Sequence, residues 1–194
     1  MSDPNFGKAK RLKLSDLDIL IAPGLGGGSP DHWYARWVEK LSTARRIEQA
    51  NWNEPNYDDW IARITDAATR CERPVILVGH SLGALSIAHA AQRLENSSVT
   101  AAYLVAPPST RVLATLPEVD PRFGAMPSTP LPFPSVLVAS RDDPYATFDE
   151  SEAMAQDWGS TIADAGNAGH INAESGHGPW PEGLIRFAGF LKTL

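Results

Sequence analysis

Short apolar runs alternate along the chain with longer segments whose apolar residues repeat every three to four positions. The stronger runs lack the polar alternation of a strand with one solvated face, so they are typical of strands covered on both faces. Strands are predicted at residues 19–22, 45–50, 75–78, 101–105, 136–139 and 161–163. The patterns at 45–50 and 161–163 are the weaker ones, because apolar residues there are few.

The segments between these runs have helical periodicity. Trp33, Trp37 and Leu41 recur every four residues, and Ser29 followed by Pro30 predicts the cap and first turn of that helix. Further helices are predicted over about residues 60–71, 81–94, 149–158 and 181–191. Strands that alternate with helices form parallel sheets with right-handed crossovers. The pattern predicts an α/β fold with a mostly parallel central sheet of about six strands and helices on both faces.

The length of 194 residues fits one domain. We predict a flexible tail at residues 1–15 and a single domain at 16–194. Residues 107–134 hold eight of the sixteen prolines, which argues against a long helix there. This segment is either a stiff surface connection or a small flap over a site at the strand ends. The fold should therefore have little or no cap domain.

Composition excludes several classes of partner. The net charge of −6 argues against a nucleic-acid partner, which normally requires a basic face. No apolar run approaches the ~20 residues that span a bilayer. Cys71 is the only cysteine, so no internal disulfide is possible, and this fits a cytoplasmic protein. A homo-oligomer is compatible with the sequence.

The strand predicted at 75–78 ends in Gly79-His80-Ser81-Leu82-Gly83, and a helix follows. This is G-x-S-x-G in the strand–turn–helix context of a nucleophilic serine. Side chains at the two glycine positions would collide with neighbouring backbone in so tight a turn. The helix start would direct N–H groups and a partial positive charge at an oxyanion. The alternative is that the glycines serve helix–sheet packing and Ser81 only caps the helix.

A serine is a weak nucleophile without a base, and the base needs an orienting acid. In this kind of site the chain order is serine, then acid, then histidine. Asp142 and Asp143 both follow the strand at 136–139. Pro144 restricts Asp143 to an extended backbone. We favour Asp143 as the acid and keep Asp142 as the alternative.

Five histidines are candidates for the base. His170 follows the last predicted strand, which is where the base belongs, and we favour it. His177 lies closer to the final helix and is the rival, as a loop-packing or substrate-contacting residue. The side chain of His80 should point away from that of its neighbour, the serine. His32 and His89 fall within predicted helices, where a surface or core role is commoner.

The loop at residues 23–29 is rich in glycine and follows the first strand. It contains neither G-x-x-x-x-G-K-[ST] nor G-x-G-x-x-G, so phosphate binding is not indicated. A serine hydrolase needs a backbone N–H from this loop and one from the residue after the nucleophile. We assign the oxyanion hole to the N–H groups of Leu25 and Leu82.

Several segments, in this order, resemble the retinoblastoma-binding-protein/YdeN-type small α/β-hydrolases, in particular their bacterial branch. The segments are "PGLGGGSPDHWYARW", "GHSLG", "YLVAPP", "LPFPSVLVASRDDPY" and "AGHINAESGHGPWPEG". The resemblance implies a triad of Ser81, Asp143 and His170, since the family's acid directly precedes proline and its base lies in "AGHIN". One departure is Pro23-Gly24, where such hydrolases commonly have His-Gly.

Together these patterns predict a serine hydrolase that cleaves a small carboxylic ester, thioester or amide through an acyl-enzyme. No metal or organic cofactor is implied, and the partner is a small-molecule substrate. The alternative is a non-catalytic protein-binding adaptor with a vestigial site, for which some of the six tryptophans could form a surface. The retinoblastoma-pocket pattern L-x-C-x-E is absent around Cys71.

Overall fold

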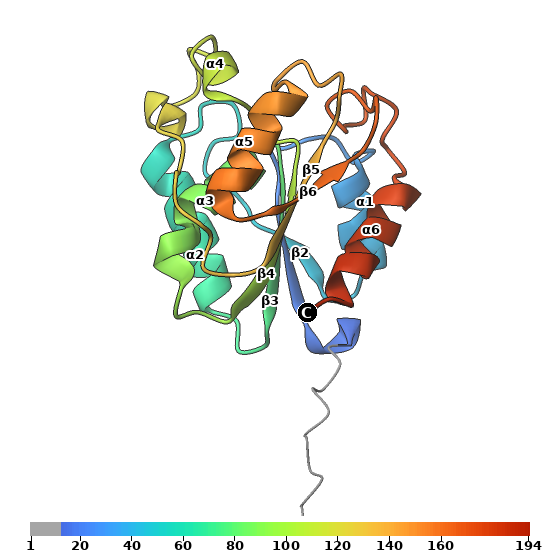
Figure 1. Cartoon of the computed structure of the whole chain (residues 1–194). Helices are drawn as coiled ribbons and strands as arrows, with labels where there is room; N and C mark the ends of the chain where they lie inside the picture. The colour runs from blue at the N-terminus through green and yellow to red at the C-terminus, as the bar shows by residue number, and fades with distance from the viewer. Residues whose placement is uncertain (1–12) are drawn as a thin grey trace, which may run out of the picture.

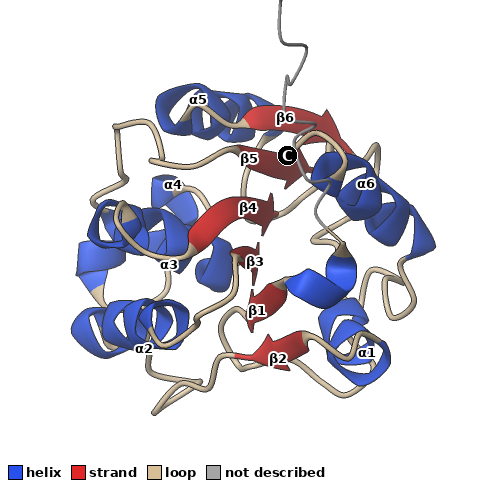
Figure 2. Ribbon diagram, turned by 90° about the horizontal axis from the view of Figure 1, so that it is seen from below, coloured by secondary structure: helices blue, strands red, loops and turns tan. Residues whose placement is uncertain are grey.

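The computed structural model describes residues 13–194, and its centre is a six-stranded parallel sheet between two layers of helices (Figures 1 and 2). The strands are β1 (Asp18–Ala22), β2 (Ala44–Arg46), β3 (Val75–His80), β4 (Val99–Val105), β5 (Ser135–Ala139) and β6 (Thr161–Asp164). Their order is β2-β1-β3-β4-β5-β6, and every neighbouring pair is parallel. The predicted fold class is confirmed.

One layer holds α1 and α6, and the other holds α2, α3 and α5 (Figure 2). The helices are α1 (Trp33–Lys40), α2 (Tyr57–Thr69), α3 (Leu82–Ala90), α5 (Phe148–Trp158) and α6 (Pro181–Leu191). Successive side chains of β3 enter opposite layers, with Leu77 in one core cluster and Ile76 and Val78 in the other. This double coverage is why the strong apolar runs lack polar alternation.

Several predicted boundaries differ from the structure by a few residues, among them the end of β3, which includes Gly79 and His80, and the differences at α1, α3 and β2 have local causes. The cap of α1 is His32 rather than Ser29, because the chain turns once more, with the N–H of His32 donating to the carbonyl of Ser29, before the helix begins. The helix predicted at 81–94 ends as an α-helix at Ala90 and continues as a 3-10 turn (Ala91–Leu94). The strand predicted at 45–50 ends at Arg46, because β1, with which it pairs at the edge of the described sheet, ends one register position later.

The tail predicted at residues 1–15 lies mostly outside the described residues, and its last part contributes to a 3-10 turn (Leu14–Asp16) at the start of the domain. The proline-rich segment 107–134 forms no long helix. It contains only the four-residue α4 (Thr110–Leu113) and a 3-10 turn (Pro121–Gly124). The buried side chain of Phe123 anchors it to the core. Over residues 13–194, no helix has both the length and the apolar character needed to cross a bilayer.

Candidate active site

A cavity of about 290 Å³ opens at the carboxyl ends of the strands. This is the end of the molecule that carries α4 at the top of Figure 1. Its walls come from the loop after β1, the turn after β3, the proline-rich segment and the loops after β5 and β6. Ser81, His170, Leu25 and Leu82 all line it. The parallel sheet therefore brings four of the five predicted site residues into one space, as expected for a site at strand ends.

Ser81 occupies the turn between β3 and α3 with φ 54° and ψ −126°, a conformation that costs energy for a residue with a side chain. Its N–H donates to the carbonyl of Val105 over 2.9 Å, which fixes the turn to β4. A Cβ on Gly83 would lie 2.1 Å from the carbonyl oxygen of Ala22. A Cβ on Gly24 would lie 2.8 Å from the Cβ of Ser81. The hydroxyl of Ser81 makes no capping bond to α3. The turn therefore projects the serine instead of using it as a helix cap.

The side chains of His170 and Asp143 contact each other. The Nδ1 atom of His170 lies 3.0 Å from both carboxylate oxygens of Asp143, whose side chain is only 3% exposed. The N–H of Tyr145 donates to the same carboxylate over 2.8 Å. Because an ionised carboxylate only accepts hydrogen bonds, Nδ1 carries the proton and Nε2 is left as the basic nitrogen. A histidine held this way can accept a proton at Nε2.

The carboxylate of Asp142 contacts different groups from that of Asp143. Its Oδ1 accepts from the hydroxyl of Ser140 over 2.8 Å and from the N–H of Gly169 over 2.7 Å. The hydrogen bond from Ser140 and then that from Gly169 lower the pKa of the Asp142 carboxyl. Asp142 thus ties the loop after β5 to the loop of His170, while its neighbour contacts the imidazole.

Leu25 and Leu82 line the cavity, and within residues 13–194 the N–H of neither residue donates a hydrogen bond to a backbone carbonyl. Leu82 is the first residue of α3, and its N–H belongs to the end of the helix that carries partial positive charge. The prediction that these two N–H groups form an oxyanion hole stays a prediction.

The other histidines have distinct contacts. His80 is buried, and its Nε2 lies 2.9 Å from the carbonyl oxygen of His170, to which it donates. His177 contacts Ser175 and is absent from the cavity lining, so it packs the loop. His89 lies on α3, where its ring contacts Tyr57 and Phe123.

Sequence reasoning missed His32 and Tyr34, which both line the cavity. Burial lowers the pKa of His32 to about 3 and raises the pKa of Tyr34 to about 12, so both are uncharged at neutral pH. Their place in the sequence could have indicated this, since both come shortly after the glycine-rich loop that follows β1. No cluster of histidine, cysteine and acidic side chains suited to a metal ion occurs in the described range 13–194.

Comparisons with known proteins identify the family of this chain and the fold that it shares with solved structures. The profile of a family described as serine hydrolase matches residues 19–189. A structure described as a YdeN-like hydrolase, from Pectobacterium atrosepticum, is 34% identical with a TM-score of 0.80, and the match covers 92% of each chain. The ydeN gene product of B. subtilis is 21% identical with a TM-score of 0.75, covering 89% of this chain and 97% of that chain. Esterase 2 of Thermogutta terrifontis is 16% identical with a TM-score of 0.66, covering 95% and 86%. No curated protein sequence matches.

Proposed function

Because the chain belongs to the serine hydrolase family and is of the YdeN type, we propose that it cleaves a small carboxylic ester, thioester or amide through an acyl-enzyme on Ser81. The observation that carries this proposal is the position of Ser81. It projects from a strained strand–turn–helix junction into a cavity that it shares with a histidine already paired to a buried carboxylate.

In the first half of the reaction, Nε2 of His170 accepts the proton of the Ser81 hydroxyl as its oxygen attacks the carbonyl carbon. Asp143 holds the imidazole in the correct tautomer and stabilises the imidazolium that forms. The carbonyl oxygen becomes an oxyanion, and the N–H groups of Leu25 and Leu82 donate to it. Nε2 then delivers its proton to the leaving alcohol, thiol or amine.

In the second half, a water molecule takes the place of the leaving group. Nε2 accepts a proton from that water as its oxygen attacks the acyl carbon, and the same two N–H groups hold the new oxyanion. When the tetrahedral intermediate collapses, the bond to the Ser81 oxygen breaks and Nε2 returns the proton to it. The free acid leaves, and the site is restored.

The cavity indicates the size of the acyl group. Its volume is about 290 Å³, at the lower limit of the range usual for small-molecule sites. Leu113, Leu116 and Val119, from the proline-rich segment, give it an apolar wall. This supports the flap interpretation of that segment, and it favours short acyl chains.

The proposed nucleophile and base are tested by fluorophosphonate labelling and mass spectrometry of the modified peptide. The wild type is expected to be labelled at Ser81, and labelling is expected to be lost in Ser81→Ala and in His170→Ala. His177→Ala is the matched control, because His177 belongs to the same loop as His170 but does not line the cavity. A folded wild type that takes no label would contradict the proposal and favour the adaptor alternative.

Acyl preference is tested with a series of para-nitrophenyl esters. Because the cavity is small, kcat/KM is expected to fall at least about tenfold between butyrate and palmitate, the difference that a misfit of a few methylenes produces. An enlarged pocket in Leu116→Ala is expected to shift the optimum toward longer chains. Equal kcat/KM for all chain lengths would show that the cavity does not bind the acyl group.

A further inference from the structure

His32 and Tyr34 are polar side chains of the cavity wall that have no part in the proposed acyl transfer. His32 and Tyr34 are 4% and 2% exposed, and both line the cavity beside Ser81. Their rings stack with a centroid separation of 3.7 Å, and the ring of His32 also meets the edge of His80 at 4.7 Å. The two side chains therefore form one rigid polar surface.

His32 contributes less to stability than other residues would at its position. It occupies the N-cap of α1, a position at which Ser, Thr, Asp or Asn would accept a bond from the helix, yet its side chain makes no capping bond. Its Nδ1 is buried without a hydrogen-bond partner in residues 13–194. A buried residue that neither caps its helix nor pairs its own nitrogen is not explained by helix stability, and its place in the cavity lining offers a functional explanation.

Tyr34 reaches the glycine-rich loop. A Cβ on Gly28 would lie within 2 Å of the Tyr34 hydroxyl oxygen, at 1.8 Å, so only glycine leaves room for the phenol. Gly28 and Ser29 line the same wall of the cavity. The phenol hydroxyl has no hydrogen-bond partner within the described part of the chain, and it is therefore free to bind a ligand group.

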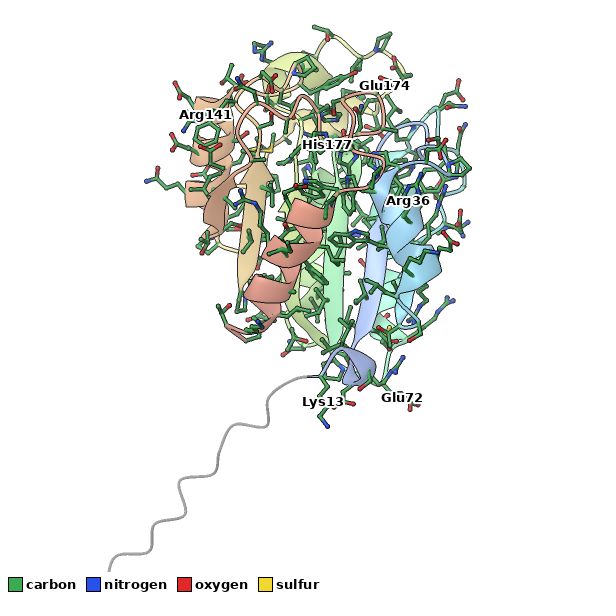
Figure 3. The ribbon with its side chains drawn as sticks, turned by 90° about the vertical axis from the view of Figure 1, so that its right-hand side faces the viewer. Lys13, Arg36, Glu72, Arg141, Glu174 and His177 are labelled. Carbon is green, nitrogen blue, oxygen red and sulfur yellow. The ribbon has the colours of Figure 1, made fainter. Side chains whose placement is uncertain are left out.

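The charges around the cavity restrict what this surface can bind. Burial keeps the imidazole of His32 and the phenol of Tyr34 uncharged at neutral pH. Among the described residues that line the cavity, the only formally charged side chain is that of Glu174, which lies near the top of the molecule in Figure 3. A carboxylate or phosphate on the substrate would be repelled by Glu174, and Arg46, whose charge acts on the Tyr34 phenol, does not itself line the cavity. A neutral hydroxyl or amide can both donate to and accept from an imidazole and a phenol.

We propose that His32 and Tyr34 form a subsite that binds an uncharged hydroxyl or amide group of the substrate. This inference rests on the proposed function and narrows its substrate class. The substrate is a small ester, thioester or amide that carries a second, uncharged hydrogen-bonding group in its acyl or leaving part. The apolar wall of Leu113, Leu116 and Val119 receives the remaining hydrocarbon.

The test uses two pairs of esters in which a hydroxyl replaces a methyl group. Para-nitrophenyl β-hydroxybutyrate is compared with para-nitrophenyl isovalerate, and hydroxyethyl butyrate with propyl butyrate. The readout is the ratio of kcat/KM for the hydroxyl ester to that for its methyl partner, measured in each variant. Intrinsic reactivity cancels, because each ester is compared with itself between proteins.

In Tyr34→Phe, which removes only the hydroxyl, the ratio is expected to fall about 3- to 10-fold for at least one pair, the effect of one hydrogen bond between uncharged groups. His32→Phe keeps a stacked ring and is expected to lower the same ratio. Tyr57→Phe is the matched control, because Tyr57 lies on α2 and does not line the cavity. Its ratio is expected to equal that of the wild type.

Unchanged ratios for both pairs in both variants, with the methyl esters still cleaved, would overturn the subsite and leave the proposed function intact. Failure of the proposed function looks different. The wild type would then cleave none of the four esters and would take no fluorophosphonate label at Ser81.

Discussion

Asp142 and Asp143 are neighbours in sequence, but their carboxylates accept from different groups. Asp143 faces the Nδ1 of His170 at 3.0 Å, whereas Asp142 accepts from Ser140 and Gly169. One carboxylate can therefore orient the base, while the other fixes the loop that carries it. The proposed division of labour makes the two residues a matched pair for mutagenesis.

Asp143→Asn is expected to lower kcat by about 10³- to 10⁴-fold, because an amide can no longer hold His170 in the tautomer with a basic Nε2. Asp142→Asn is expected to lower kcat less than about tenfold, since its amide oxygen still accepts the bonds that tie the loops. The measurement is kcat on para-nitrophenyl butyrate for both variants. Equal losses would mean that the acid has been assigned to the wrong aspartate.

At the scale of elements, the turn between β3 and α3 depends on how closely α3 approaches β1. A side chain at Gly83 would run into backbone, since its Cβ would lie 2.1 Å from the carbonyl oxygen of Ala22 and 2.4 Å from that of Pro23. Backbone cannot move aside as a flexible side chain can. The helix and the strand must separate if this glycine is replaced.

Gly83→Ala is expected to lower the free energy of unfolding by about 2–4 kcal/mol, as overpacking against backbone does. Gly189→Ala is the control, because α6 has nothing within 4 Å of the added Cβ. That change is expected to raise stability by about 0.5–1 kcal/mol. Urea unfolding measures both. A Gly83→Ala protein as stable as the wild type would contradict the close approach.

Five of the six tryptophans are buried where helices pack on the sheet. Trp33 and Trp37 of α1 pack with Trp180 before α6, while Trp60 of α2 and Trp158 of α5 are buried in the other layer. They form parts of the two cores between helices and sheet. The exposed tryptophan surface that the adaptor alternative would use is therefore not formed by these five residues.

Across the whole molecule, burial makes folding sensitive to mild acid. Burial lowers the pKa of His32 to about 3, lowers that of His80 well below its usual value, and lowers that of His89. In the unfolded chain these groups titrate near 6.5. Below that pH the unfolded state binds protons that the folded state does not, so stability is complete above about pH 6.5 and is lost as the pH falls.

The free energy of unfolding is therefore expected to fall steadily between about pH 6.5 and 4.5, before most carboxylates titrate. His32→Phe removes one of these groups and is expected to flatten the slope by up to about 1.4 kcal/mol per pH unit. Urea unfolding at several pH values gives the slope of each protein. A wild-type stability that stays constant over this window would show that the histidines are protonated in the folded state.

The sequence by itself determined the succession of strands and helices along the chain, the parallel sheet and the turn that carries Ser81. These features follow from local rules. Runs without polar alternation are strands covered on both faces, and two glycines that flank a serine between a strand and a helix allow one kind of tight turn. The exact ends of β2, α1 and α3 did not follow, because they depend on where a partner strand stops or a loop turns.

Only the tertiary structure decided which side chains from separate loops face one another. The orientation of Asp143 toward His170 results from loops after β5 and β6, which hydrogen bonds through Asp142 join. His32 and Tyr34 reach the cavity from the N-cap and the first turn of α1, which begins later than the sequence predicts. Side-chain direction in a loop depends on contacts with distant parts of the chain, and such contacts leave no periodic signal in the sequence.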